Sequence, residues 1–326
     1  GRDPGGAARR RRDRRGGERP LMPLVSVVLP TRNRAGILDR TARSVLAQSF
    51  TDFELIVVDD ASTDGTARLV EALGDSRVRL LKLERNLGPA GTRNAGIGEA
   101  RGRLVAFEDD DDEWLPMKLS RQVKALEAAG GSVGAAYCVA VKRSAGEEML
   151  YPHPGVKRRS GKLYDDLLGG NFIATPSLLV RKQVLEAVGG FDASLRFLED
   201  WDLCLKLARS CELVCVDSVE VVIGDTPGSL SKAQSREKAR AYARIYENHR
   251  SALEANPALA AKHLFYIGKH HCQGGELAEG RRRLREAARL LRSPKHVGGY
   301  LLTFLGGSGC AGAFGLLGRL GVVKEM

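Results

Sequence analysis

The sequence predicts an α/β fold, in which an open and mostly parallel sheet is followed by a helical C-terminal appendage. Two observations support this prediction. Short runs rich in β-branched residues alternate with helical patterns over the first third of the chain, and beyond about residue 230 the sequence becomes helical and basic. Strands and helices that alternate at this spacing are typical of parallel strands connected by helices.

The predicted strands of the first part are short apolar runs at residues 24–29, 53–58, 78–83 and 103–107. Helical patterns lie between them, at residues 36–48, 66–73 and 88–100. This order of elements is Rossmann-like, and such sheets bind ligands at the carboxyl ends of their strands. The polar clusters TRNR, DDASTD and EDDDDE each follow a strand directly. The sequence therefore predicts a ligand site at this edge of the sheet.

The alternation becomes irregular after about residue 117. We expect helices at residues 118–129, 182–188 and 199–209, and strands at residues 133–141, 171–180, 211–216 and 219–223. A helix at residues 235–255 and a helical hairpin over residues 258–292 follow, with the turn of the hairpin at Gly274 and Gly275.

The net charge of +11 is concentrated near the N-terminus, where residues 1–20 include eight arginines. We interpret residues 1–22 as a disordered Arg/Gly-rich tail, because they lack hydrophobic periodicity. Such a tail could also be translated sequence upstream of a start at Met22. The alternative is a nucleic-acid arm. The remainder of the chain is only mildly basic, which argues against a nucleic-acid binder. The six cysteines form no CxxC pair, which disfavours a structural zinc site. Several lie in apolar runs, which is typical of buried cysteines in a reducing compartment.

The strongest chemical signal is the segment FEDDDDEWLP at residues 107–116. Its four consecutive aspartates repel one another unless a cation lies among them. Carboxylate oxygens are hard ligands that suit Mg²⁺ or Mn²⁺, ions that also bind substrate phosphates. A loop that only caps the next helix is the alternative, but a cap needs one aspartate and not four.

Three further polar motifs are ambiguous by themselves. Asp60 ends a predicted strand, where it could contact a nucleoside or only open a turn. Arg93 follows a predicted helix start, a position that favours a bound phosphate but also suits a surface charge. Glu199, Asp200 and Asp202 surround a tryptophan at another helix start. They could supply a general base or only favourable charge at the helix N-terminus.

The order of the motifs resolves this ambiguity. VSVVLPTRNR, FELIVVDDASTDGT, NLGPAGTRNAG, VAFEDDDDEWLPMKL, GGFD and EDWDLCLKLA follow one another over about residues 23–225. This set resembles family 2 of the inverting glycosyltransferases, which have the glycosyltransferase A fold. The resemblance implies a glycosyltransferase domain at residues 23–230, with a nucleotide-binding half at 23–116 and an acceptor half at 117–230. Residues 231–326 are then a helical C-terminal region.

The same resemblance implies roles for individual residues. Asp200 matches the catalytic base, and Asp111 matches the principal metal ligand of the DxD motif. Asp60 would contact the nucleobase, and Arg93 would lie near the diphosphate. The other predicted substrate-binding residues are Pro30, Arg32, Asp109, Asp110 and Glu199. The implied reaction is one in-line displacement, in which an acceptor hydroxyl replaces the nucleotide diphosphate with inversion and a divalent metal, Mg²⁺ or Mn²⁺, assists.

Two positions depart from the family pattern. Arg32 stands where many members have an aromatic residue, so base stacking there would use a guanidinium plane. Glu108 replaces the usual apolar residue before the DxD motif, and nothing in the sequence explains its charge.

Other classes of protein fit the sequence less well. A dehydrogenase would need a GxGxxG turn after the first strand, where this chain has PTRN. A phosphohydrolase would need a Lys and Ser/Thr constellation that the sequence does not offer. The remaining alternative to an active enzyme is a catalytically dead sugar- or nucleotide-binding protein of the same fold.

The sequence also suggests partners and a location. A carboxylate at Asp60 can accept the imide N–H of uracil or thymine, which favours a UDP or dTDP sugar donor, although guanine also has a ring N–H. The acceptor is expected to be a glycan or a lipid-linked sugar of the cell envelope, and no nucleic acid is expected. Residues 297–318 carry no charge and follow a basic helix at 281–292. They predict a cytoplasmic protein in peripheral contact with the inner face of the membrane, with a Gly-rich packed hairpin as the alternative.

Overall fold

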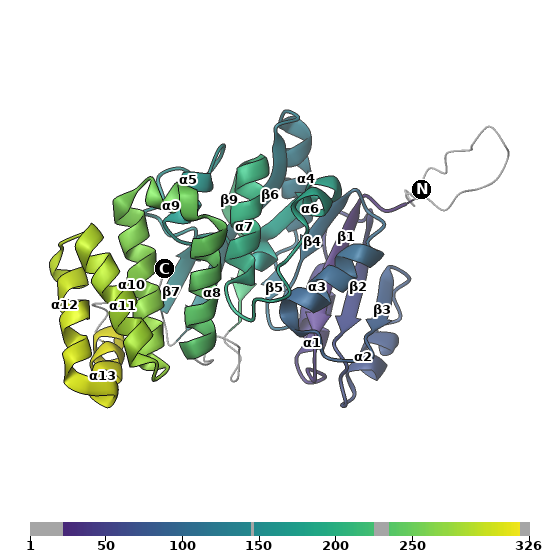
Figure 1. Cartoon of the computed structure of the whole chain (residues 1–326). Helices are drawn as coiled ribbons and strands as arrows, with labels where there is room; N and C mark the ends of the chain where they lie inside the picture. The colour runs from purple at the N-terminus through teal and green to yellow at the C-terminus, as the bar shows by residue number, and fades with distance from the viewer. Residues whose placement is uncertain (1–21, 145–146, 225–234, 320–326) are drawn as a thin grey trace, which may run out of the picture.

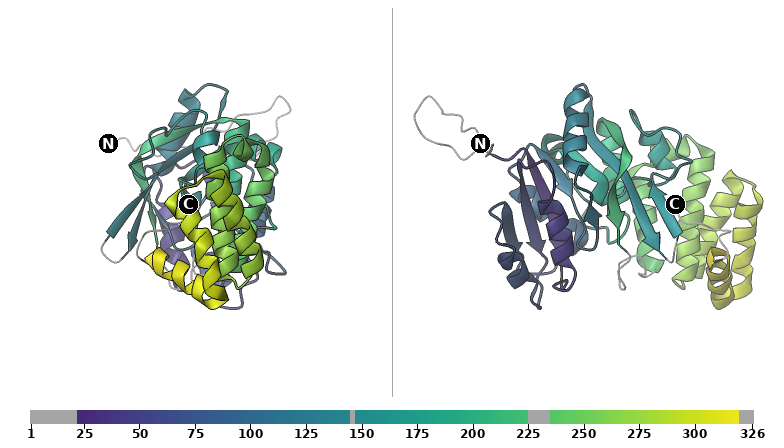
Figure 2. Two further views of the ribbon diagram at one scale, coloured as in Figure 1. Left: turned by 60° about the vertical axis from the view of Figure 1, so that its left-hand side comes forward. Right: turned by 180° about the vertical axis from the view of Figure 1, so that it is seen from behind.

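The structure is a computed structural model that describes residues 22–144, 147–224 and 235–319. The molecule is elongated, with parallel strands at one end and the C-terminal helices at the other (Figure 1). A view from behind shows the same order of elements along the length of the molecule (Figure 2). The predicted N-terminal tail, apart from Met22, lies outside the described residues.

One long sheet runs through the described part of the chain and contains nine strands. Their bounds are β1 (Val25–Thr31), β2 (Phe53–Asp59), β3 (Val78–Lys82), β4 (Leu104–Phe107), β5 (Glu113–Trp114), β6 (Val133–Ser144), β7 (Glu147–Tyr151), β8 (Leu178–Arg181) and β9 (Glu212–Ile223). The order across the sheet is β3-β2-β1-β4-β8-β6-β9-β5, and β7 pairs with β6.

The first four strands form the parallel part of the sheet, in the order β3-β2-β1-β4. The helices α1 (Leu38–Leu46), α2 (Thr66–Ala72) and α3 (Gly88–Glu99) connect them. All seven residues of β2 are buried, because parallel strands covered on both faces bury both sets of side chains. Alternate residues enter two separate cores: Ile56 and Val58 face one, and Leu55 and Val57 face the other. The predicted α/β fold is confirmed.

Beyond β4 the sheet is mixed. Strand β8 is antiparallel to both β4 and β6, whereas β9 is parallel to β6. The helices of this part are α4 (Lys118–Ala128), α5 (Tyr164–Leu168), α6 (Lys182–Val188) and α7 (Glu199–Ser210). We refer to β1–β4 with their helices as the parallel part and to residues 113–223 as the mixed part.

Two strand predictions in the mixed part were wrong in detail. The expected strand at residues 171–180 begins only at Leu178, because residues 171–174 are irregular and Thr175–Ser177 form the short 3-10 helix η1. Pro176 has no N–H for a strand ladder, which favours this turn. The expected pair of strands at 211–216 and 219–223 is the single strand β9, whose pairing with β6 is irregular around Val219.

The C-terminal helices pack side by side at the end of the molecule (Figure 1). They are α8 (Ser235–Asn248), α9 (Arg250–Glu254), α10 (Pro257–Gln273) and α11 (Leu277–Leu290), followed by α12 (Pro294–Leu302), η3 (Thr303–Leu305) and α13 (Gly306–Arg319). Helices α10 and α11 form the predicted hairpin, and Gly275 in its turn has a φ of 82° that favours glycine.

The uncharged segment does not form one straight helix. The stretch Pro294–Leu317 is long and apolar enough to cross a membrane, and only 17% of its most apolar window is buried. Gly306, with a φ of 77°, breaks it into α12 and α13. Phe314 is buried against Phe265 of α10, whereas Leu301, Phe304 and Leu305 are each more than half exposed.

Candidate functional site

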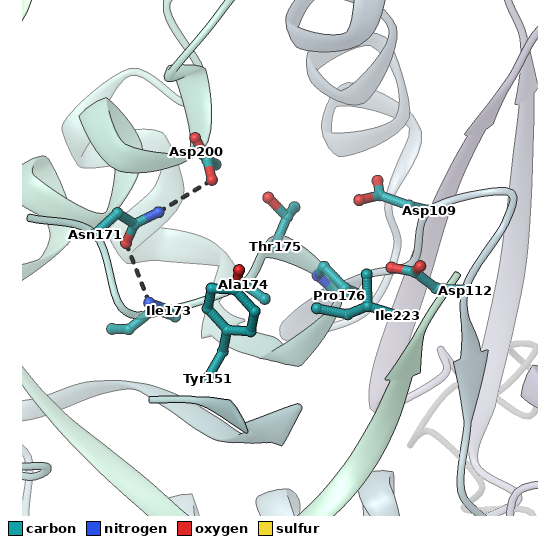
Figure 3. Close-up of a pocket in the computed structure, with 10 residues that line it drawn as sticks. All are labelled: Asp109, Asp112, Tyr151, Asn171, Ile173, Ala174, Thr175, Pro176, Asp200 and Ile223. Carbon is teal, nitrogen blue, oxygen red and sulfur yellow. Dashed lines mark hydrogen bonds between the residues drawn. The ribbon is translucent and has the colours of Figure 1, made fainter. Parts of the chain in front are cut away.

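A pocket of about 200 Å³ opens beyond the carboxyl end of β4. Figure 3 shows Asp200 on one side of it and Asp109 and Asp112 on the opposite side. The residues that line the pocket are Asp109, Asp112, Tyr151, Asn171, Ile173, Ala174, Thr175, Pro176, Asp200 and Ile223. The predicted base and two aspartates of the acidic loop thus share one cavity, although about 90 residues separate them in the sequence.

The acidic loop after β4 is fixed by contacts with neighbouring elements. Asp110 accepts a hydrogen bond from the Thr31 hydroxyl at 2.8 Å, and Asp112 accepts one from the backbone N–H of Gly224 at 2.8 Å. Burial raises the pKa of Asp110 to about 6. Burial, reinforced by the Asp109 carboxylate, holds the pKa of Asp112 well above its usual range. The loop therefore concentrates negative charge at an unfavourable cost, which a bound cation would relieve.

Arg93 connects the acidic loop to the helix that carries Asp200. It lies on α3, is 6% exposed, and forms ion pairs with Asp109 and with Glu199, the latter at 3.1 Å. Its guanidinium also lies over the Phe191 ring, 5.4 Å from the centroid. The predicted position of Arg93 near a diphosphate stays a prediction. In the structure its guanidinium forms ion pairs with Asp109 of the acidic loop and with Glu199 of α7.

Asp200 lies in the first turn of α7 and faces the pocket. Its carboxylate accepts hydrogen bonds from the Trp201 backbone N–H at 2.8 Å and from the Asn171 amide at 3.0 Å. Burial raises the pKa of Asp200 to about 6; the Glu199 carboxylate adds to this rise, whereas Arg93 opposes it. A carboxylate with such a pKa can hold a proton briefly and still be ionised at neutral pH, as a general base requires.

Asp60 follows β2 and is 5% exposed. Its two carboxylate oxygens accept the backbone N–H groups of Leu87 at 2.7 Å and Gly88 at 3.1 Å. These donors lie at the start of α3 and have no partner within that helix, so Asp60 caps α3 from a neighbouring strand. The predicted contact with a nucleobase stays a prediction, and the sequence did not reveal this structural role.

The loop after β1 presents the other residues predicted on the donor side. Pro30 is half-buried within β1, and Arg32 is exposed just beyond it. Asn33 joins this loop to the loop after β2, because its amide oxygen accepts the Thr63 backbone N–H at 2.8 Å. Contacts of Pro30 and Arg32 with a substrate stay predictions.

The residues present fit a divalent cation bound partly through substrate phosphates. Asp111 is half-buried in the acidic loop, next to Asp110 and Asp112, whose pKa values are raised by burial and by the neighbouring carboxylates. Within the described residues no group of three His, Cys, Asp or Glu side chains could hold a metal ion by itself. Mg²⁺ and Mn²⁺ need only one or two carboxylates where phosphates and water complete the coordination. The oxygen-only donor set matches this kind of site.

Glu108 lies beneath the acidic loop and is fully buried. One carboxyl oxygen accepts the Asp109 backbone N–H at 3.0 Å, and the other has no hydrogen-bond partner. Burial and the Asp112 carboxylate hold the pKa of Glu108 well above its usual range. Lys118 is also fully buried nearby, with its ammonium 3.6 Å from the centre of the Trp114 ring. Glu108 thus stabilises the backbone of the acidic loop through its hydrogen bond with Asp109.

Several residues of the pocket were missed by the sequence analysis. Asp112 belongs to the acidic run, but only the tertiary structure shows that it, rather than Asp111, lines the pocket. Tyr151 and Asn171 carry no local signal, because strand pairing and an irregular loop bring them to the site. Pro176 was the available signal that residues 171–180 do not form a continuous strand.

Comparison with known proteins identifies the chain's relatives. Succinoglycan biosynthesis protein ExoO of Rhizobium meliloti is 46% identical over 112 residues, which are 34% of this chain and 32% of that protein. UDP-Glc:alpha-D-GlcNAc-diphosphoundecaprenol beta-1,3-glucosyltransferase WfgD of Escherichia coli is 40% identical over 103 residues, which are 32% of this chain and 41% of that protein. The matched stretches therefore span less than half of these curated relatives.

Solved structures share the fold over most of the chain. The structure of S. aureus TarS 1-349 in complex with UDP-GlcNAc has a TM-score of 0.66 at 18% identity and covers 91% of this chain and 92% of that one. The mannosyltransferase PcManGT of Pyrobaculum calidifontis, in complex with GDP-Man and Mn²⁺, has a TM-score of 0.58 at 20% identity, with coverages of 93% and 89%. These likenesses confirm the predicted glycosyltransferase A type of fold. Residues 26–189, half of the chain, match the model of glycosyl transferase family 2, and the chain belongs to this family.

Proposed function

We propose that this protein transfers a sugar from a nucleotide diphosphosugar to an acceptor hydroxyl, with inversion at the anomeric carbon. The observation that carries this proposal is the pocket with a buried carboxylate, Asp200, on one side and the acidic loop on the other. A displacement needs a base on the acceptor side and charge compensation on the leaving-group side, and the two sides of the pocket offer these chemistries.

In the proposed reaction Asp200 takes the proton from the acceptor hydroxyl as this oxygen attacks the sugar. The hydrogen bonds from Trp201 and Asn171 fix the carboxylate during this step. Arg93 forms ion pairs with both Asp109 and Glu199 and so links the two sides of the pocket. Pre-organisation of this kind lowers the entropic cost of aligning the reacting groups.

The donor is proposed to bind at the carboxyl ends of β1, β2 and β4. Asp60, Pro30 and Arg32 would contact the nucleoside, and Asp109 and Asp111 would hold Mg²⁺ or Mn²⁺ beside the diphosphate. When bound, the ion supplies positive charge that stabilises the leaving diphosphate. Support comes from the names of similar proteins, which include a UDP-Glc-dependent glucosyltransferase and a mannosyltransferase solved with GDP-Man and Mn²⁺.

The test is a panel of UDP, dTDP, GDP and ADP sugars, incubated with the purified protein and Mn²⁺. Release of the nucleotide diphosphate is measured with and without candidate acceptors. We expect release from one class of donor, and none with the Asp200→Asn variant above the uncatalysed rate. Tight donor binding without any release, in the presence of acceptors of every class tested, would favour the alternative of a catalytically dead binding protein.

The acceptor is proposed to be a glycan or lipid-linked sugar of the cell envelope, reached at the cytoplasmic face of a membrane. Similar proteins include one named for succinoglycan biosynthesis and one named for transfer to a diphosphoundecaprenol-linked sugar. Leu301, Phe304 and Leu305 are exposed, and the Arg281 guanidinium is 4.8 Å from the centre of the Phe304 ring. Exposed apolar side chains beside cations suit an anionic bilayer surface.

Co-sedimentation with vesicles tests this location. The parent protein should sediment with phosphatidylglycerol vesicles and less with phosphatidylcholine vesicles. The triple variant Leu301→Ser, Phe304→Ser, Leu305→Ser should stay in the supernatant and still release nucleotide from the donor. These substitutions are cleaner than a deletion, because Phe314 and Cys310 cover α10. Equal sedimentation of parent and variant would contradict the proposed membrane contact.

A further inference from the structure

Helix α10 of the C-terminal region contacts a loop whose Asn171 side chain is hydrogen-bonded to Asp200, the predicted base. This loop runs from the end of α5 to Ile173 and carries Asn171, which lies beside Asp200 at the pocket (Figure 3). The Asn171 side chain makes two hydrogen bonds: its oxygen accepts the Ile173 backbone N–H at 3.1 Å, and its nitrogen donates to Asp200 at 3.0 Å. Because a backbone N–H can only donate, the first bond fixes which end of the amide faces Asp200. Asn171 therefore presents a donor to the carboxylate.

Three consecutive carbonyl groups before Asn171 each accept a hydrogen bond from a side chain. Leu167 accepts from the Trp201 indole at 2.7 Å, Leu168 accepts from the His263 ring at 2.8 Å, and Gly169 accepts from the Lys262 ammonium. The last carbonyls of a helix have no partner within it, so such side chains fix the end of α5 and the loop that follows. Two of the three donors belong to α10, in the C-terminal helical region.

His263 is suited to a fixed structural contact. It is fully buried, and burial lowers its pKa to about 4, so that it is neutral at pH 7. A carbonyl accepts only, so the ring nitrogen that faces Leu168 carries the proton. The His263 ring also lies 5.4 Å from the ring of Trp201, the neighbour of Asp200. Helix α10 thus contacts both the loop of Asn171 and the first turn of α7.

We propose that Asn171 is a positioning residue for Asp200, and that Lys262 and His263 of α10 hold Asn171 in place. The C-terminal helices are then part of the catalytic unit and not a separate appendage. This inference rests on the proposed role of Asp200 as the base. Its physical content is that a donor hydrogen-bonded to the carboxylate orients it and favours its charged form.

The electrostatic surroundings of Asp200 set the direction of the expected change. The groups that face it are Glu199 and Cys204 on α7, Arg93 on α3 and Asp109 after β4. Burial raises the pKa of Asp200 to about 6. A hydrogen bond from the Asn171 amide favours the charged form of the carboxylate and therefore opposes this rise. Without this donor the pKa of Asp200 should move further upward, and the rate should fall most at low pH.

The test compares Asn171→Ala with the parent over pH 5–9. We expect kcat to fall about tenfold at pH 7, the usual scale for a hydrogen bond to a charged group. The acid limb should move up by about one pH unit, and the Kd for the nucleotide should not change. The pKa of Asp200 can also be measured without an acceptor, from the carboxyl carbon-13 signal that Asp200→Asn removes. An unshifted acid limb and an unshifted carboxyl signal would overturn the positioning role.

A double-mutant cycle tests the part played by α10. Lys262→Met keeps the aliphatic chain and removes only the ammonium donor to Gly169, and it should lower kcat about threefold or more with the same upward shift of the acid limb. In the Asn171→Ala background it should have no further effect, because the two residues act through one contact. Arg285→Met, on the exposed face of α11, is the matched control and should behave as the parent. Additive losses from Lys262→Met and Asn171→Ala would contradict the role of α10.

Failure of this inference can be told apart from failure of the proposed function. An Asp200→Asn variant with normal transfer would show that Asp200 is not the base. An inactive Asp200→Asn variant beside an Asn171→Ala variant with the parent's rate and pH profile would contradict only the positioning role.

Discussion

The parallel part and the mixed part of the sheet build the two sides of the pocket in different ways. In the parallel part, Thr31, Asp60 and Asp109 follow or end neighbouring strands, and the register of the sheet brings these strand ends to one edge. In the mixed part, Asn171, Tyr151 and Asp200 come from a loop, a strand end and a helix start that meet only through tertiary packing. The side of the pocket that is proposed to bind the sugar donor is therefore recognisable from short sequence patterns. The side that is proposed to bind the acceptor depends on contacts between residues far apart in the sequence.

This difference makes a general prediction. Changes on the parallel side should alter nucleotide binding together with the rate, whereas changes on the mixed side should alter the rate alone. Arg93 connects the two sides directly, through its ion pairs with Asp109 and Glu199. The following substitutions test this separation.

The largest effect is expected for Asp111→Ala, on the parallel side. Loss of this predicted metal ligand should abolish transfer and weaken the binding of the nucleotide, because the diphosphate loses its bridging cation. Treatment of the parent protein with EDTA should have the same two effects, and added Mn²⁺ should reverse them. Calorimetry with UDP and a transfer assay measure both quantities. Full activity in EDTA would contradict the metal assignment.

Asp200→Asn, on the mixed side, should lower the rate by about 10²–10⁴-fold, the usual scale for removing a general base. The Kd for the nucleotide and the metal dependence should stay unchanged, because neither ligand needs the base. In the parent, the rate should fall as the pH drops through about 6, where the raised pKa of Asp200 leaves the carboxylate protonated. An ordinary aspartate would lose activity only near pH 4.

Asp165→Asn, on the exposed face of α5, is the matched control for this substitution and should behave as the parent. A weakened Kd for the nucleotide in Asp200→Asn would show that the two sides of the pocket are not separable.

The sequence predicted the parallel part well because its signals are short-range. A buried strand, a turn and a helix each leave a pattern within about a dozen residues, and the DxD run needs no long-range contact to be visible. The same logic fails for residues 171–180, where Pro176 and the Asn171 side chain favour an irregular loop over the expected strand. Helix α10 was predicted as part of the hairpin, but its contacts were not, since nothing in its sequence indicates that Lys262 and His263 bind the loop beside Asp200.

A smaller effect is expected for Asp60→Asn, on the parallel side. The parent should bind UDP more tightly than ADP, because a carboxylate can accept the uracil imide N–H. The variant should bind UDP about tenfold more weakly, the usual scale for a hydrogen bond to a charged group, and should discriminate less between the two nucleotides. It should also be less stable to heat, since one of the two N–H groups at the start of α3 would then face the NH₂ end of the amide, which cannot accept a hydrogen bond. Equal Kd values for UDP and ADP in the parent would contradict the nucleobase assignment.

The smallest effect is expected for Glu108→Gln, beneath the acidic loop. Burial and Asp112 hold the pKa of Glu108 well above its usual range, which favours the neutral form of its side chain. Glutamine has nearly the same shape, and its amide oxygen can replace the acceptor of the Asp109 backbone N–H. The melting temperature should therefore stay within about 3 °C of the parent value, and the rate and the Kd for the nucleotide should stay within about twofold.

Glu108→Ala is the informative partner variant, because it removes both the acceptor and the buried volume. It should lower the melting temperature by more than Glu108→Gln and weaken nucleotide binding, since the loop loses its support from below. If Glu108→Gln instead weakened nucleotide binding tenfold, the charge of Glu108 would belong to the donor side, and its departure from the family pattern would be functional and not structural.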